Sequence, residues 1–295
     1  MTELVVISGK GGTGKTTVAG SLVALAKGAV AADCDVDAAN LHLILRGEPL
    51  ERVPYRGSEE ALIDQEKCVS CGACRRVCRF DAVLVVGNRY EIDPLSCEGC
   101  GACAHVCPAG AIRMEERQSG WIYVSRTPYG ILVHGELLPG EENSGKLVTQ
   151  VKMRARMIAG KEGAALLIVD GSPGIGCPVI ASLSGAHAAL IVAEPSRAAL
   201  HDLLRVAGVA RHFRAKLFLV LNKADLSPKL AREVGEAAAQ EGMVCLGEIP
   251  YDEGVTWAQL RGLPVVETHG PAATAIREIW EKLRKGLYGE GRGCG

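Results

Sequence analysis

A glycine-rich loop with two lysines lies near the start of the chain. It reads GKGGTGKT from Gly9 to Thr16 and fits G-x-x-x-x-G-K-[ST], in which backbone N–H groups and the positive end of a following helix bind phosphate oxygens. Lys15 is expected to pair with the β- and γ-phosphates of a nucleotide, and Thr16 to ligate Mg²⁺. The predicted nucleotide-binding residues here are Gly9, Lys10, Gly11, Gly12, Thr13, Gly14, Lys15, Thr16 and Thr17.

Eight of the twelve cysteines follow the spacing C-x₂-C-x₂-C-x₃-C twice. In this spacing three thiolates bind one iron–sulfur cube and the fourth binds the other cube. Zinc is the alternative metal, but zinc sites favour paired cysteines separated by longer loops. We therefore predict one [4Fe–4S] cluster on Cys68, Cys71, Cys74 and Cys107, and a second on Cys97, Cys100, Cys103 and Cys78.

Composition and charge narrow the class of protein. Of the 295 residues 48% are apolar and 4% aromatic, a bias that suits strands buried between helices. The formal net charge of −1 gives no strong signal for nucleic acid or an anionic membrane. Because no apolar run approaches membrane-spanning length and the N-terminus enters a strand pattern at once, we expect a cytoplasmic protein without a secretory signal.

Apolar strand-like runs alternate with helix-like runs along most of the chain. The strand-like runs end in polar residues, as in ALLIVDGSPG at 165–174 and KLFLVLNKAD at 216–225. This alternation predicts an α/β fold with a mostly parallel sheet, helices on both faces, and ligands at the carboxyl ends of the strands. The cysteine motifs interrupt the pattern as a small α+β insert. The predicted parts are 1–55 and 118–288 for the α/β domain, 56–117 for the insert and 289–295 for a flexible tail.

The loop KGGTGKTT resembles the deviant Walker A box of the MinD/ParA/Mrp ATPases, which include the nitrogenase iron protein. The resemblance implies a homodimer that sandwiches two ATP molecules, with Lys10 reaching the partner's nucleotide and Lys15 acting on its own. A positive group that arrives from the partner stabilises charge on the transferred phosphoryl group. A solvated loop lysine is the alternative for Lys10.

The resemblance extends to the acids and glycines that follow the other strands. DCDVD is similar to the switch I segment of the family, and the resemblance implies that Asp35 orients the attacking water and that Asp33 lies near the Mg²⁺ shell. Asp37 is the alternative for either role. In IVDGSPGIG the resemblance implies that Asp170 holds Mg²⁺ through water and that Gly174 senses the γ-phosphate through its N–H. The implied catalytic residues are Lys10, Lys15 and Asp35.

Residues of the adenine site are also implied by the resemblance. Asn222 in NKAD would read the adenine edge, with a turn-forming side chain as the alternative. Pro250 and Asp252 in IPYD would line the base pocket.

The insert resembles bacterial two-cluster ferredoxins. It departs from them after Cys78, where Arg79 replaces the proline that follows Cys107. Since the insert follows the switch I acids, we predict that nucleotide state gates electron transfer from the clusters to a redox partner protein. Two alternatives are ATP-dependent assembly or delivery of a metal cluster to an accepting protein, and a MinD/ParA-like positioning protein with structural clusters.

The cysteines outside the two motifs and the C-terminal segment leave alternatives open. Cys177 either ligates a metal near a dimer axis or is a buried, inert thiol. Cys34 and Cys245 are expected in the core, and Cys294 in the tail. The stripe Ile276, Ile279, Trp280, Leu283 and Leu287 suits either a helix that packs on the sheet, which we favour, or a membrane-surface helix.

Overall fold

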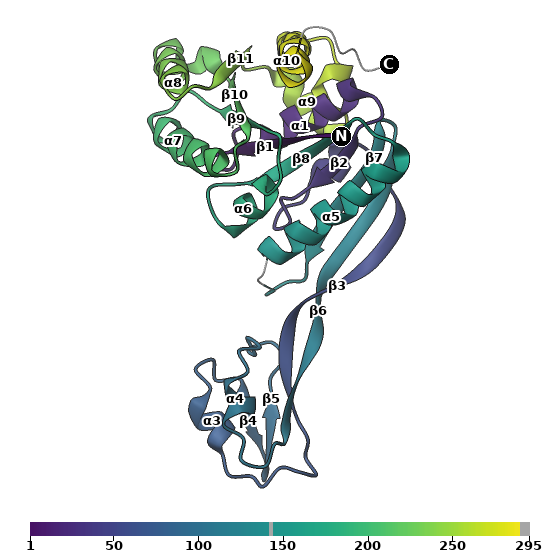
Figure 1. The fold of residues 1–295 in the computed structure, drawn as a ribbon, viewed down its shortest axis with the longest axis vertical. Coiled ribbons are helices and arrows are strands. Elements are labelled where there is room, and N and C mark those ends of the chain that lie inside the picture. The colour runs from purple at the N-terminus through teal and green to yellow at the C-terminus, as the bar shows by residue number, and fades with distance from the viewer. Residues whose placement is uncertain (142–143, 290–295) are drawn as a thin grey trace. The chain divides into compact units, whose positions relative to one another are not determined.

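The computed structural model describes residues 1–141 and 144–289. The described residues form two compact units. The first comprises Met1–Val53, Ile122–Glu136 and the chain from Ser144 onward, and the second comprises Pro54–Trp121 and a short segment that begins at Leu137. Figure 1 shows the elements of both units. The predicted tail, with Cys294, lies almost wholly outside the described residues.

The first unit is built on parallel strands, as the sequence predicts. One nine-stranded sheet has the order β11-β10-β9-β1-β8-β2-β7-β6-β3, and its strands from β11 to β7 run parallel. These strands are β1 (Thr2–Ser8), β2 (Val30–Asp33), β7 (Gly130–Leu137), β8 (Leu166–Pro173), β9 (Ala188–Ala193), β10 (Lys216–Asn222) and β11 (Val244–Ile249).

Helices cover both faces of this sheet (Figure 1). One face carries α1 (Lys15–Ala26) and α10 (Pro271–Tyr288), and the other carries α5 (Ser144–Glu162), α6 (Cys177–Leu183), α7 (Arg197–His212) and α8 (Pro228–Gln240). The remaining helices of this unit are α2 (Leu41–Ile44), α9 (Glu253–Leu260) and the 3₁₀ turns η1 (Ala224–Leu226) and η2 (Val265–Glu267).

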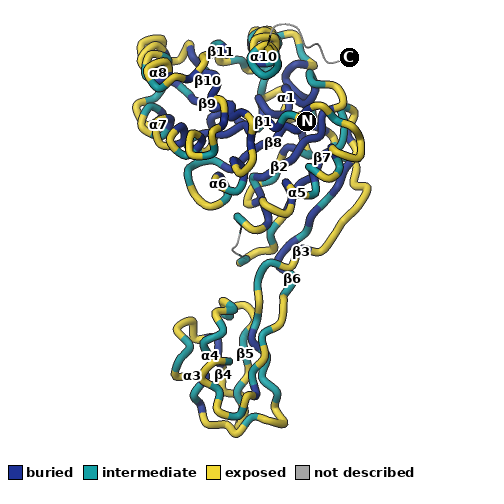
Figure 2. The backbone as a smooth tube through the Cα atoms, in the orientation of Figure 1, coloured by how far each residue is buried: buried dark blue, intermediate teal, exposed yellow. Residues whose placement is uncertain are grey.

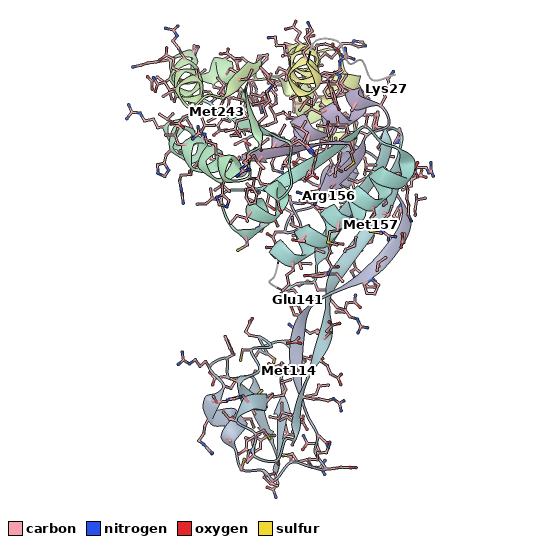
Figure 3. All side chains as sticks on the ribbon, viewed as in Figure 1. Lys27, Met114, Glu141, Arg156, Met157 and Met243 are labelled. Carbon is pink, nitrogen blue, oxygen red and sulfur yellow. The ribbon has the colours of Figure 1, made fainter. Side chains whose placement is uncertain are left out.

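The central strands are buried on both sides, which their apolar, β-branched sequences favour. Every residue of β1 after Thr2 is buried (Figure 2). Glu3 is the one charged residue in that run, and its carboxylate accepts hydrogen bonds or ion pairs from Lys152 at 2.7 Å and from Arg156 at 2.7 and 3.0 Å. Both partners come from α5, on which Figure 3 labels Arg156, so this pairing ties α5 to the central strand.

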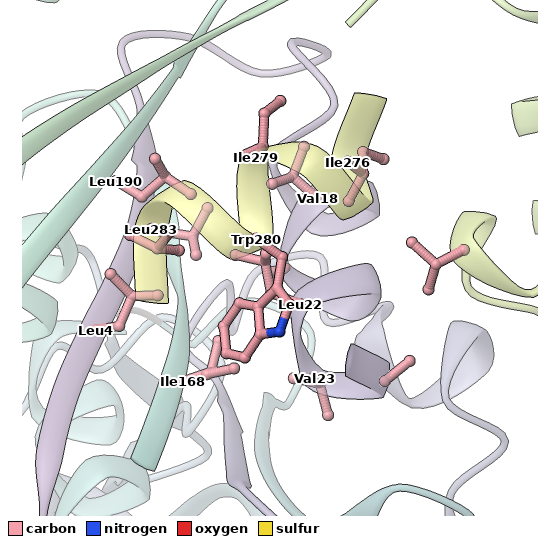
Figure 4. Close-up of a cluster of buried hydrophobic side chains, with 14 of the residues drawn as sticks. Leu4, Val18, Leu22, Val23, Ile168, Leu190, Ile276, Ile279, Trp280 and Leu283 are labelled. Atoms are coloured by element: carbon pink, nitrogen blue, oxygen red, sulfur yellow. The ribbon is translucent and has the colours of Figure 1, made fainter. Parts of the chain in front are cut away.

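The C-terminal helix packs in the core. Ile276, Ile279, Trp280 and Leu283 of α10 are at most 8% exposed and meet α1 and the central strands, as Figure 4 shows. The stripe is therefore used inside the protein, which confirms the favoured alternative. No helix among the described residues combines the length and the hydrophobicity needed to cross a bilayer.

Two strands of 16 residues each, β3 (Glu48–Ile63) and β6 (Ile112–Thr127), run from the first unit into the second. The second unit also contains α3 (Ala73–Val77), α4 (Ala102–His105) and the antiparallel pair β4 (Val83–Val86) and β5 (Arg89–Ile92). Its segment after Leu137 belongs with it because Glu141, labelled in Figure 3, accepts an ion pair from Arg117 at 2.9 Å and a hydrogen bond from Ser58 at 2.9 Å. The sequence analysis placed this segment in the α/β domain.

Candidate functional site

The glycine loop lies between β1 and the N-terminus of α1. Gly12 and Gly14 have φ of 79° and 90°, a region that favours glycine. A Cβ on Gly14 would lie 2.3 Å from the Asn222 side-chain nitrogen, so this position also admits no larger residue. No side chain caps α1, which leaves its first N–H groups available to an anion.

Lys15 is buried among three carboxylates at the ends of β2 and β8. Its Nζ lies 2.7 Å from Asp170 Oδ1 and 3.5 Å from Asp35 Oδ2, and 3.5 Å from the Thr16 hydroxyl. Desolvation lowers the pKa of Lys15, but the charges of Asp170, Asp35 and Asp33 outweigh it and raise the pKa. The ammonium is therefore charged at neutral pH, ready for phosphate oxygens.

Asp170 and Thr16 fit a Mg²⁺ site. Asp170 is fully buried, and its Oδ2 has no hydrogen-bond partner in the described structure. A buried carboxylate oxygen without a partner is costly, and a hard, oxygen-seeking cation would satisfy it. Mg²⁺ commonly keeps several waters and uses only one or two carboxylates. The small number of candidate protein ligands, Asp170 and Thr16, agrees with this.

Asp33 and Asp35 perform different tasks. The carboxylate of Asp33 accepts hydrogen bonds from the N–H groups of Asp35, Asn40 and Leu41 at 3.0–3.1 Å, so it shapes switch I and starts α2. Burial, followed by the charge of Asp170, raises the pKa of Asp33 to about 7. Asp35 is only partly buried and faces Lys15, while Asp37 is exposed.

Lys10 is paired within its own chain. Its ammonium contacts Glu194, the residue after β9, and Lys223 lies 3.9 Å from the same carboxylate. The side chain of Lys10 is 36% exposed and that of Glu194 is 22% exposed. The sequence does not predict this pair, because Lys10 and Glu194 are far apart along the chain. The trans role of Lys10 stays a prediction, and it requires Lys10 to leave Glu194.

Two residues that are predicted to contact the nucleotide make hydrogen bonds to other parts of the protein in this structure. The N–H of Gly174 donates to the Ser8 carbonyl at 2.8 Å. The side-chain amide of Asn222 donates to the Thr13 carbonyl at 2.8 Å. Gly174 therefore joins the segment after β8, which resembles switch II of the family, to β1. Asn222 supports the phosphate loop. Their γ-phosphate and adenine contacts stay predictions.

A pocket of about 240 Å³ adjoins the loop. Its lining contains the predicted Asn222, Pro250 and Asp252, together with Gly12, Gly14, Thr17, Val18, Lys223, Ile249, Tyr251, Val255, Thr256, Gln259 and Ile276. The carboxylate of Asp252 caps α9 through Gly254 N at 2.8 Å and accepts from Ala272 N at 3.1 Å. Its role in the structure is thus to hold two helix starts. Gln259, which donates to the Thr17 hydroxyl at 2.8 Å, has no signal in the sequence because the two residues are distant along the chain.

The eight motif cysteines line two cavities in the second unit. One is lined by Cys68, Cys71, Cys74 and Cys107, and the other by Cys78, Cys97, Cys100 and Cys103. The remaining wall residues are mostly apolar or glycine. In each cavity three cysteines of one motif meet the last cysteine of the other.

These cysteines do not form a site for a single ion. Within the described residues, no three His, Cys, Asp or Glu side chains are grouped as one metal ion would require. A zinc ion holds its thiolates at about 2.3 Å, whereas a cube spreads four thiolates over its corners. The all-thiolate donor set and apolar walls fit a [4Fe–4S] cluster.

The expectation of burial is wrong for Cys245, and so is the buried alternative for Cys177. Cys34 is buried, as expected, but Cys245 and Cys177 are exposed. Cys245 is exposed because it lies on the edge strand β11, where strand-like sequence does not guarantee burial. Cys177 begins α6, just after switch II.

The fold and site together define a P-loop nucleotide-binding protein. The chain belongs to the CobQ/CobB/MinD/ParA nucleotide binding domain family, whose model matches residues 4–265. MinD/ParA members are ATPases, and the chain is an ATPase of this group.

Two curated relatives come from Methanocaldococcus jannaschii, and both are uncharacterized proteins. MJ0578 is 33% identical over 288 residues, 96% of each chain. MJ0579 is 29% identical over 235 residues, which cover 77% of this chain and 83% of the relative.

Solved structures share the fold at low identity. The septum site-determining protein MinD of Pyrococcus horikoshii, complexed with Mg-ADP, has a TM-score of 0.58 at 20% identity over 99% of this chain and 100% of its own. The MinC:MinD cell division complex of Aquifex aeolicus gives 0.58 at 18% identity over 100% and 99%. The ATP complex of Cyanothece McdA(D38A) gives 0.55 at 18% over 100% and 99%.

Proposed function

We propose that this protein is a dimeric ATPase in which nucleotide state gates electron transfer through two [4Fe–4S] clusters in the second unit. The observation that carries the proposal is the division of eight cysteines between two cavities. The exchange of the fourth cysteine between motifs is the arrangement that two-cluster ferredoxins use. When bound, the clusters would act as one-electron carriers that pass electrons to a partner redox protein.

The nucleotide site supports hydrolysis of ATP with Mg²⁺. Thr16 and Asp170 would hold the ion, and Lys15 would stabilise charge on the β- and γ-phosphates. Asp35 lies close to Lys15 and would orient the attacking water. That water would attack the γ-phosphorus while the bond between the γ-phosphorus and the oxygen that bridges it to the β-phosphate breaks. Lys10 of the second protomer would complete the charge stabilisation. In this proposal Lys15 exchanges its bond to Asp170 for the phosphates.

Switch I is connected to the cluster unit by a short path along the chain. Asp33 holds the start of α2 through Leu41 N at 3.0 Å, and α2 is followed by β3, which continues into the second unit. A change at Asp33 and Asp35 on nucleotide binding would therefore act on the first residues of β3. The proposed coupling would therefore run along β3 from switch I to the cluster unit.

The proposal is tested by oxidation of the reduced protein with a mild electron acceptor under anaerobic conditions. We expect ATP to change the oxidation rate relative to ADP, and the change to disappear in Lys15→Ala. Equal rates with ATP, with ADP and in the variant would refute gating. Iron and sulfide analysis on the same samples shows whether the clusters are present.

Positioning is the second candidate function. It is suggested by the solved neighbour from Pyrococcus horikoshii, a septum site-determining protein whose likeness to this chain shows the fold alone. Cosedimentation with phospholipid vesicles or DNA that depends on ATP would support it. Delivery of a cluster through the exposed Cys177 predicts that Cys177→Ser loses iron beyond that held by the eight motif cysteines.

A further inference from the structure

The short helix α3 contributes to both cysteine cavities. Cys74 lies within it and lines one cavity, while Cys78 follows it and lines the other. The outward residues Arg75 and Arg79 are exposed, and Phe80 is 46% exposed while it also lines the second cavity. Phe80 therefore lies in the wall of a predicted cluster site, and Arg75 and Arg79 are exposed residues close to it along the chain.

The side chains of Arg75 and Arg79 make no ion pair with the described residues of the unit. Ion pairs among its described residues use Lys67, Arg113 and Arg117. The adjacent Arg76 is engaged, since it donates to the Cys71 carbonyl at 3.1 Å. The guanidinium groups of Arg75 and Arg79 are thus left to solvent.

The internal repeat provides a comparison within the same chain. The second motif has the same cysteine spacing and also forms a short helix, α4. At the positions equivalent to Arg75, Arg79 and Phe80 it carries Ala104, Pro108 and Ala109. Holding a cluster therefore does not require the arginines or the aromatic ring, and they need another explanation.

We propose that Arg75, Arg79 and Phe80 form the docking surface for a small acidic electron-carrier protein of the ferredoxin class. This inference rests on the proposed electron-transfer function and adds where the partner binds. Arginine and aromatic residues are enriched at interface centres, and charges of one sign steer an oppositely charged partner. Asp81 is the one acid in the segment 75–81, against three arginines. Contact at Phe80 brings a partner's redox centre next to the cavity of Cys78.

The test measures association with a purified, acidic two-cluster ferredoxin. The variant is Arg75→Gln with Arg79→Gln, and the matched control is Arg56→Gln with Arg89→Gln, which removes the same charge from exposed positions of the same unit. Rates are followed by stopped-flow mixing with the reduced ferredoxin, and affinity by calorimetry with the oxidised one. At low ionic strength we expect association to fall about tenfold in the variant and less than about twofold in the control.

Three results would overturn the docking surface. They are equal losses in variant and control, no loss in either, and loss of binding to phosphatidylglycerol vesicles in the variant while ferredoxin binding is unchanged. Iron and sulfide are measured first in every sample. A wild-type protein without clusters would refute the proposed function, whereas calorimetry would still decide the docking surface.

Discussion

Substituting Glu194→Gln removes the carboxylate that holds Lys10 within its own chain. The two side chains are 36% and 22% exposed, and ion pairs at such exposure contribute about 0.2–1 kcal/mol after solvent screening. If Lys10 acts on the partner's nucleotide, each protomer of a dimer must break this pair. The two losses together cost about 0.4–2 kcal/mol, so Glu194→Gln should tighten ATP-dependent dimerisation by about 2–30-fold.

The assay is ATPase activity per chain as a function of protein concentration. The concentration at half-maximal activity should fall by that factor in Glu194→Gln, with the plateau rate little changed. Sedimentation in the presence of a non-hydrolysable ATP analogue measures the dimer directly. Glu241→Gln, which removes a comparable exposed pair with Arg211, is the control and should match the wild type.

The reasoning fails under either of two results. One is a Glu194→Gln variant whose dimerisation matches that of wild type and control. The other is a rise in the half-maximal concentration, which would mean that Glu194 itself stabilises the dimer.

Three further predictions concern the buried charges and the clusters. Lys15→Met leaves Asp170 buried without its cation and should lower the free energy of unfolding by about 3–5 kcal/mol. Chemical denaturation that gives the wild-type value would contradict this. Burial and Asp170 raise the folded-state pKa of Asp33 from 3.8 to about 7, so the contribution of protonated Asp33 to stability is lost as pH rises from about 4 to 7. Asp33→Asn should therefore gain stability relative to wild type by about 1 kcal/mol per pH unit from pH 5 to 7. A difference in unfolding free energy that does not change with pH would speak against this. Cys107→Ser should lose one cluster and about half of the iron, while Cys245→Ser, at an exposed cysteine outside the cavities, should keep it all; equal iron in both would count against the assignment.

The sequence predicted the parallel sheet because its buried strands are aliphatic and alternate with helices. It also predicted the phosphate loop, because its backbone adopts positive φ angles that favour glycine and so leave a pattern in the local sequence. Long-range pairs were not predictable, since Lys10–Glu194 and Gln259–Thr17 join residues whose spacing carries no pattern.

The extent of the two connecting strands was also missed. The insert was expected to begin at 56, but β3 runs unbroken from Glu48 to Ile63. Nine of its 16 residues are exposed and its apolar residues do not alternate with polar ones, so hydrophobic alternation gives a weak signal there. Cys245 was misplaced for a related reason, since the order of strands in the sheet decides whether a strand lies at the edge.

An anaerobic redox titration monitored by EPR tests the central claim most directly. The midpoint potentials are compared without nucleotide, with ADP and with a non-hydrolysable ATP analogue. Nucleotide gating predicts a shift of some tens of millivolts, about 1 kcal/mol of coupling for a one-electron centre. Identical potentials in all three states, in protein that contains both clusters, would contradict it.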